Sequence, residues 1–184
     1  MSTQIVWLRQ DLRLADHPAL TEAAKRGPVV PVFIWAPEEE GAFPPGGASK
    51  WWLHQSLTSL AEALRARGSR LVVRAGASLD VLRELIRETG ATGVHWSRRY
   101  EPAAMERDRA VKAALRSDGV EAESYNSALL FEPWTVSNKT GKPFQVFTPY
   151  YRHCLTLESP ARPLPAPVLA APAAWPASMA MSTP

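Results

Sequence analysis

Three charged side chains stand at alternate positions directly after a short apolar run near the start of the chain. Arg9, Asp11 and Arg13 follow Ile5–Leu8, and uncharged residues separate them. An unbroken apolar run of this length is typical of a strand buried on both faces. The charges then lie at the carboxyl end of a central parallel strand, where ligands collect in open α/β sheets. They either solvate a loop or form buried pairs, and we expect pairing because each has an apolar neighbour.

Aromatic side chains form a second group whose types suit ligand binding. Trp35, Trp51 and Tyr100 lie near expected strand ends or the start of a helix. There they can wall a cleft for a planar ligand. The sequence assigns Trp52 and Trp96 to the core instead.

Motifs for several other chemistries are absent or incomplete. GxGxxG does not follow the first strand, GxSxG is absent, and GGASK at 46–50 lacks the P-loop spacing. The single cysteine, Cys154, excludes an internal disulfide and a cysteine-based zinc cluster. The histidines lack metal-ligand spacing: His17, His54, His95 and His153. No catalytic constellation is visible, so an autonomous enzyme is the weakest interpretation.

Composition indicates a protein with a real core. The chain has 184 residues, 46% of them hydrophobic, and a formal net charge of +3. That charge is compatible with nucleic acid nearby but is no argument for it. Neither a signal peptide nor a membrane-spanning segment is recognisable, so we expect a cytoplasmic protein without membrane contact.

Strand and helix patterns alternate along most of the chain. We expect strands at 5–8, 29–35, 70–75, 93–96 and 120–124, and helices at 18–26, 49–67, 78–89 and 102–117. Asp16, Ser49 and Ser78 are the expected N-caps. This alternation predicts right-handed crossovers and a parallel sheet with helices on both faces.

The pattern breaks after the fifth strand. We expect an α/β domain at 1–130 and a turn-rich extension at 131–157, with Thr148 as the cap of a short helix at 149–157. Residues 158–184 are mostly proline and alanine, which predicts an extended, poorly packed interdomain linker.

An ordered series of motifs resembles DNA photolyases and cryptochromes. The series covers residues 5 to about 157 and is closest to plant-type cryptochromes and their bacterial photolyase relatives. It comprises WLRQDLR at 7–13, DHPAL at 16–20, PVFI at 31–34, SKWWLHQSL at 49–57, YEP at 100–102, EPWTV at 132–136 and GKPFQVFTP at 141–149.

This resemblance implies an open five-stranded parallel sheet of order 3-2-1-4-5, a Rossmann-like domain that holds a light-harvesting antenna chromophore. In the family, a larger helical domain holds FAD, binds the pyrimidine dimer in damaged DNA and transfers the electron. We expect that FAD-binding domain to be absent from this chain, and therefore no repair turnover by the chain alone. The parent enzyme is expected to be a deoxyribodipyrimidine photolyase.

The expected antenna site lies over the carboxyl ends of the first, second and fourth strands. Lys50, at a helix N-terminus, would favour an anionic tail, and its alternative role is a solvated charge. The candidate cofactor-binding residues are Trp35, Glu38, Lys50, Trp51, His54, Arg98, Tyr100 and Glu101.

The same resemblance also indicates which chromophore the antenna site would hold. Folate-binding bacterial photolyases carry an Asn-Glu pair and a loop histidine, where this chain has Ala103, Ala104 and, roughly, Pro45. Plant-cryptochrome-like relatives hold folate in a somewhat different pocket. Methenyltetrahydrofolate is therefore favoured, with a deazaflavin or FMN as alternatives.

An interdomain surface is also expected. Its candidates are Arg9, Asp11, Arg13, Phe144, Phe147, Tyr150 and Tyr151. In isolation, the aromatic members would form an exposed patch prone to self-association. The other interpretations are a stand-alone cryptochrome-like light sensor, an adenine-nucleotide-binding α/β module, and a remnant without a ligand.

Overall fold

A computed structural model describes residues 2–42, 44–158 and 160–181. The described residues fall into two compact units. The first unit comprises the chain up to Ser127 together with the segment that begins at Leu164, and the second lies between Ala128 and Pro163. These boundaries differ from the predicted ones, because the tail joins the first unit rather than standing apart as a linker.

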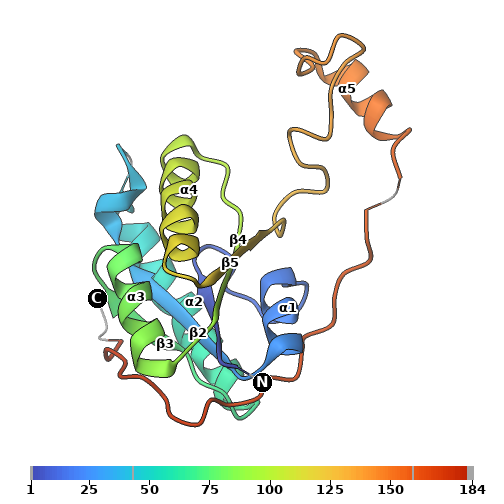
Figure 1. The fold of residues 1–184 in the computed structure, drawn as a ribbon. Coiled ribbons are helices and arrows are strands. Elements are labelled where there is room, and N and C mark those ends of the chain that lie inside the picture. Colours follow the sequence, from blue (N-terminus) through green and yellow to red (C-terminus); the bar gives the residue numbers. More distant parts are fainter. Residues whose placement is uncertain (1, 43, 159, 182–184) are drawn as a thin grey trace. The chain divides into compact units, whose positions relative to one another are not determined.

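The first unit is built on a parallel sheet. Its strands are β1 (Gln4–Leu8), β2 (Val29–Trp35), β3 (Val72–Ala75), β4 (Gly93–Ser97) and β5 (Glu121–Tyr125). Their order is β3-β2-β1-β4-β5, and every neighbouring pair is parallel (Figure 1). The predicted fold class and strand order are confirmed.

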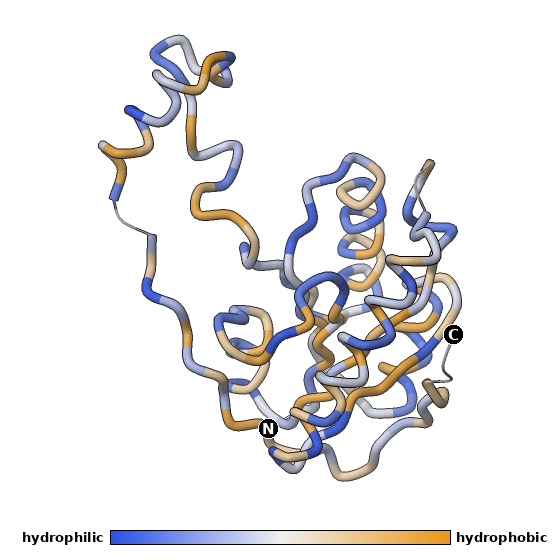
Figure 2. The backbone as a smooth tube through the Cα atoms, turned by 180° about the vertical axis from the view of Figure 1, so that it is seen from behind, coloured by the Kyte–Doolittle hydropathy of each residue, from blue (hydrophilic) through white to orange (hydrophobic). Residues whose placement is uncertain are grey.

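The helices of this unit cover both faces of the sheet (Figure 1). They are α1 (Pro18–Arg26), the 3-10 helix η1 (Pro37–Glu40), α2 (Gly47–Arg65), α3 (Ser78–Thr89) and α4 (Pro102–Ser117). Ile5 and Trp7 of β1 pack in the cluster that contains α3 and α4, whereas Val6 and Leu8 pack in the cluster with α1 and α2. Successive residues point to opposite faces, so a strand covered on both sides has to be apolar throughout. Figure 2 shows the resulting hydrophobic colouring along the central strands.

Three helix starts of the first unit differ from the predictions. Gly46, not Ser49, is the N-cap of α2, and Ser49 lies in its first turn. His17, not Asp16, caps α1, and its Nδ1 accepts the backbone N–H of Leu20 at 3.1 Å. Asp16 instead adopts a φ of 51°, a left-handed conformation that aspartate tolerates better than most residues. Ser78 lies inside α3, where its N–H and hydroxyl both donate to Glu39.

The second unit contains α5 (Phe147–Cys154), which begins two residues earlier than predicted and has Val146 rather than Thr148 as its N-cap. A turn precedes it, in which Asn138 Oδ1 accepts the N–H groups of Thr140 and Lys142 at 2.9 and 3.0 Å. No helix among the described residues has the length and apolar composition needed to span a bilayer.

Candidate functional site

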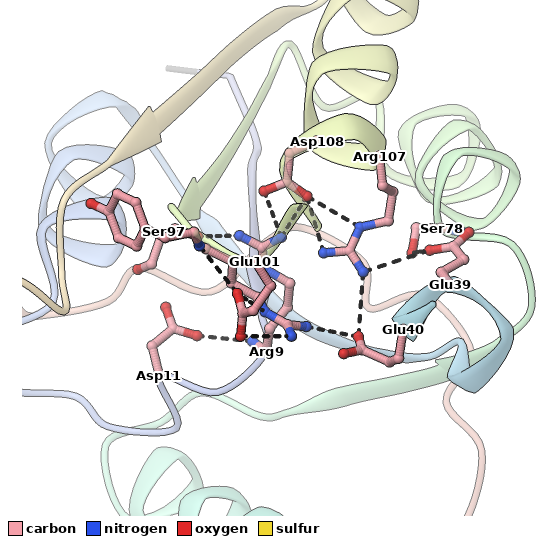
Figure 3. Close-up of polar contacts among 11 residues, drawn as sticks. Arg9, Asp11, Glu39, Glu40, Ser78, Ser97, Glu101, Arg107 and Asp108 are labelled. Carbon is pink, nitrogen blue, oxygen red and sulfur yellow. Dashed lines mark hydrogen bonds and ion pairs between the residues drawn. The ribbon is translucent and has the colours of Figure 1, made fainter. Parts of the chain in front are cut away.

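Arg9 lies at the centre of a charged cluster at the carboxyl ends of β1 and β4 (Figure 3). The side chain is 7% exposed, and its Nη1 donates to both carboxylate oxygens of Asp108 at 2.7 and 2.8 Å. Its Nη2 donates to the carbonyl oxygen of Ser97. The backbone N–H of Arg9 donates to Asp11 Oδ1 at 2.9 Å. The predicted buried pairing is therefore confirmed for Arg9 and Asp11.

His17 completes the pairing of Asp11. His17 Nε2 lies 2.9 Å from Asp11 Oδ2, while its Nδ1 accepts a backbone N–H, so Nε2 carries the proton. Burial alone would raise the pKa of Asp11. The contact with His17, with hydrogen bonds from Ser97 and the Arg9 backbone, instead holds that pKa well below its usual range.

Arg99 and Arg107 extend the cluster toward η1. Arg99 Nη1 donates to Glu40 Oε1 at 2.7 Å, and Arg107 lies 3.4 Å from the same oxygen. The hydrogen bond from Arg99 outweighs burial and lowers the pKa of Glu40. The guanidinium carbons of Arg9 and Arg107 lie 4.5 and 5.1 Å from the ring centre of Trp7, within cation–π range.

These ion pairs fill the place where doubly wound proteins bind ligands. The sheet order reverses between β1 and β4, and such a switch point usually opens into a crevice. Here the side chains that follow both strands neutralise one another instead. The adjacent cavity, which Trp7, Arg9 and Glu40 help to line, has a volume of about 100 Å³. That volume is smaller than the roughly 300–1,000 Å³ that is typical of ligand sites.

A larger pocket lies beside this cluster, at the carboxyl ends of β2 and β3. Its volume is about 320 Å³. Three predicted site residues line it: Trp35, Lys50 and His54. The remaining lining residues are Phe33, Leu53, Leu57, Val73, Arg74, Ala75, Met179, Ala180 and Met181. Three of the eight predicted site residues thus lie in this pocket, whereas charged pairs occupy the ends of β1 and β4.

The pocket combines an apolar wall with cationic groups. Phe33, Trp35 and Leu57 supply apolar and aromatic surface. Lys50 lies in the first turn of α2, which contains no acidic residue, so the helix dipole adds to its positive charge. Arg74 donates to both carboxylate oxygens of Glu88, which neutralises part of its charge. A flat ring with an anionic tail matches this distribution.

The other predicted site residues do not line this pocket. Glu38 is exposed in η1, and Trp51 is 54% exposed because it follows Lys50 by one position and turns about 100° away on the helix. The Arg98 guanidinium donates to Ser124 O at 2.8 Å, and Tyr100 Oη donates to Asn126 at 3.3 Å. Glu101 accepts from Arg99 at 3.1 Å, and this hydrogen bond lowers its pKa.

The core assignments of two further tryptophans have opposite outcomes. Trp52 is 68% exposed, so its assignment to the core is wrong, since it occupies the outer face of α2. Trp96 is 1% exposed and packs edge-on against Trp7, as expected of a core residue.

Sequence reasoning missed most of the pocket lining. Leu53 and Leu57 could have been proposed from the sequence, since they recur at helical spacing on the apolar face of α2. Arg74 lies near the end of a predicted strand and could have been proposed on that ground. Met179 and Met181 lie in the proline- and alanine-rich tail, and no local pattern connects them with a pocket.

The predicted interdomain residues divide between the units. Arg9 and Asp11 are buried in contacts within the first unit, so they are not available to a second domain. Arg13 donates to the backbone oxygens of Asp16 and Ser127 at 2.8 and 2.6 Å. The aromatic candidates all belong to the second unit, in the loop before α5 and on that helix: Phe144, Phe147, Tyr150 and Tyr151.

Comparisons with known proteins agree with this architecture. A family model described as DNA photolyase matches residues 4–168. The chain is 46% identical over 164 residues to Cryptochrome-2 of Arabidopsis thaliana, covering 89% of this chain and 27% of that protein. It is 45% identical over 180 residues to a deoxyribodipyrimidine photo-lyase of Agrobacterium fabrum, covering 97% of this chain and 37% of that protein.

A solved structure leads to the same conclusion. A bacterial class III photolyase from Agrobacterium tumefaciens superimposes with a TM-score of 0.92 at 43% identity, over 98% of this chain and 37% of that chain. The chain thus spans 27% of the length of the plant cryptochrome and 37% of the length of each of the two bacterial photolyases. With the strand order, the matched segment and these identities in agreement, the chain belongs to the DNA photolyase family.

Proposed function

We propose that this chain is the light-harvesting part of a photolyase-type protein and holds an antenna chromophore in the pocket beside Trp35. The observation that carries the proposal is the 320 Å³ pocket, with aromatic surface on one side and Lys50 and His54 within its lining. An antenna transfers excitation by dipole coupling, so its host has to fix the orientation of a planar ring. Side chains on β2, β3 and α2 provide such a rigid frame.

A solved archaeal photolyase from Sulfolobus tokodaii is described as holding two FAD molecules, with the implication of a novel light-harvesting cofactor. For this chain we propose a methenyltetrahydrofolate-type antenna. All three candidate chromophores carry a fused tricyclic ring, so the choice of folate follows the resemblance to plant-type cryptochromes and not the volume of the pocket. The carboxylates of a folate tail would remain near Lys50 and the positive end of α2.

The excitation would pass to FAD on a helical domain, which would bind damaged DNA and carry out repair. This role is assigned by homology with the deoxyribodipyrimidine photo-lyase of Agrobacterium fabrum, and the similar identity to a plant cryptochrome makes a light-sensing role the second candidate. Under either proposal, the residues of this chain supply excitation to a flavin.

Titration of the purified chain tests the proposal. We expect 5,10-methenyltetrahydrofolate to bind with a shifted near-ultraviolet absorption band, with weaker effects from a deazaflavin and FMN. ATP and AMP serve as competitors and should have no effect, because ion pairs fill the switch point at Arg9. The absence of any spectral change with all three chromophores would refute the antenna role.

A pair of substitutions locates the binding site. Ala75 lines the pocket and is exposed, so Ala75→Trp should fill the space without disturbing the core and weaken binding at least about tenfold. Ala113 is exposed on α4 and is no part of the lining, so Ala113→Trp is the matched control. Equal weakening by both variants would place the chromophore elsewhere.

We also propose that the aromatic residues of the second unit dock onto a flavin-binding domain. Phe147 and Tyr151 are 71% and 50% exposed, and their rings stack at 5.6 Å. Such a patch is unusual on a surface that meets only water. Phe147→Asp should abolish binding to the separately expressed flavin domain of a family relative, while Trp52→Asp should not. Sedimentation of the chain alone would show whether the patch causes self-association instead.

A further inference from the structure

The tail of the chain is fastened to the first unit at its beginning. We name residues 164–181 the strap. Asp16 donates its N–H to Leu164 O at 2.7 Å, and Asp16 Oδ1 accepts the N–H of Leu164 at 3.3 Å. Val29 then donates to Ala170 O at 3.0 Å, and Leu169 is 7% exposed within the apolar cluster of α1 and α2. The strap is therefore extended, as predicted, but it is attached to the first unit through Leu164, Leu169 and Ala170.

The second half of the strap reaches the free edge of β3. Arg70 donates to Pro176 O at 2.5 Å, and its guanidinium lies 5.2 Å from the ring centre of Trp175. Val73 is bound through both backbone groups, since its oxygen accepts the N–H of Met179 at 2.9 Å and its N–H donates to Ser178 Oγ at 2.9 Å. These bonds cover an edge that would otherwise be unpaired.

The last described residues of the strap form part of the pocket wall. Met179, Ala180 and Met181 line the 320 Å³ pocket together with α2 and the ends of β2 and β3. Met179 is 54% exposed, so much of its surface is still available to a ligand. Methionine is flexible and polarizable, and it adapts well to the face of an aromatic ring.

We propose that residues 178–181 of the strap close over the bound antenna chromophore and position its ring, so that chromophore binding and strap docking stabilise each other. This inference rests on the proposed function of the pocket. The end of the strap is held at Val73 by two hydrogen bonds, and residues 177–180 are exposed. Segments with few buried contacts open at low free-energy cost. A ligand that contacts only the closed form shifts this equilibrium, and the coupling is reciprocal.

Hydrogen exchange on the whole chain tests the coupling. The Met179 amide is protected only while it is bonded to Val73. Saturation with 5,10-methenyltetrahydrofolate should slow its exchange by about tenfold or more, the factor expected for roughly 1.4 kcal/mol of coupling. The Gly141 amide, which donates to Asn138 O in the second unit, is the internal control and should not change. Chromophore binding without slower exchange at Met179 would overturn the inference and leave the antenna proposal intact.

Substitutions in the wall provide the second test. Met179→Ser combined with Met181→Ser removes apolar contacts from exposed or half-buried positions, so the fold should be kept, as circular dichroism would verify. Affinity for 5,10-methenyltetrahydrofolate should fall about tenfold or more. Met105→Ser, at an exposed methionine of α4 outside the pocket, should leave it unchanged. Unchanged affinity in the double variant would overturn the strap's role, whereas a wild-type chain that binds no chromophore would overturn both proposals.

Discussion

Replacing Arg9 tests whether the charged cluster stabilises the fold or serves a ligand. Arg9→Met keeps the aliphatic stem but removes the guanidinium that bonds Asp108 and the Ser97 oxygen. Breaking one side of a buried pair costs about 3–5 kcal/mol. Arg107 continues to donate to Asp108 Oδ1 at 3.0 Å, so the carboxylate keeps one partner. We therefore expect a loss near the lower limit, about 3 kcal/mol.

Urea denaturation of the whole chain is the assay. Arg9→Met combined with Asp108→Leu removes the stranded carboxylate, and its free energy of unfolding should recover to within about 1 kcal/mol of the wild type. Arg65→Met, at an exposed position of α2, is the control and should change stability by less than about 0.5 kcal/mol. A loss below about 1 kcal/mol for Arg9→Met would refute the stabilising role. Weaker chromophore binding by a folded Arg9→Met variant would place the ligand in the cluster instead of the pocket.

Further outcomes follow from other buried contacts. Burial lowers the pKa of His95 from its ordinary value of 6.5 to about 4. As the pH falls below 6.5, the unfolded chain therefore binds a proton at His95 before the folded chain does, and the fold loses stability. Urea denaturation should show unfolding free energy decreasing by at most about 2 kcal/mol between about pH 7 and pH 5, with a smaller decrease in His95→Gln. Gly93→Ala should lower the thermal midpoint, at a cost of about 1–3 kcal/mol, because its Cβ would overlap the side-chain oxygen of Gln4. Leu169→Ala should cost about 2 kcal/mol or more in urea, and wild-type stability in that variant would contradict the packing of the strap.

The sheet could be predicted because its signal is local. The central strands β1 and β2 are short runs of apolar residues between turn residues, and α2 and α3 each carry an apolar face. Ile5 and Trp7 could be separated from Val6 and Leu8 by alternation alone. The motif resemblance then supplied the strand order, which periodicity does not determine.

The partners of the charged residues could not be predicted in the same way. Asp108 lies 99 positions from Arg9, on the exposed-looking face of a helix, and only the closed fold brings the two together. The same pairing leaves a cavity of only about 100 Å³ beside Arg9, whereas the pocket near the end of β3 has about 320 Å³.

The strap shows how composition alone can mislead. Proline and alanine indicated an extended segment without a core, and that conformation is observed. However, one leucine, one tryptophan and a few backbone hydrogen bonds are enough to fix it to the first unit: Leu169, Trp175 and the bonds to Asp16, Val29 and Val73. Such contacts depend on the surface of the first unit against which the tail packs, and the sequence of the tail alone does not reveal that surface.

Nuclear magnetic resonance of the tryptophan indole groups tests the central claim most directly. On addition of 5,10-methenyltetrahydrofolate, the indole N–H signal of Trp35 should shift strongly because this ring lines the pocket. The signal of Trp96, which is buried in the core away from the pocket lining, should stay in place. A Trp35 signal that does not move while the folate demonstrably binds would contradict the assignment of this pocket as the antenna site.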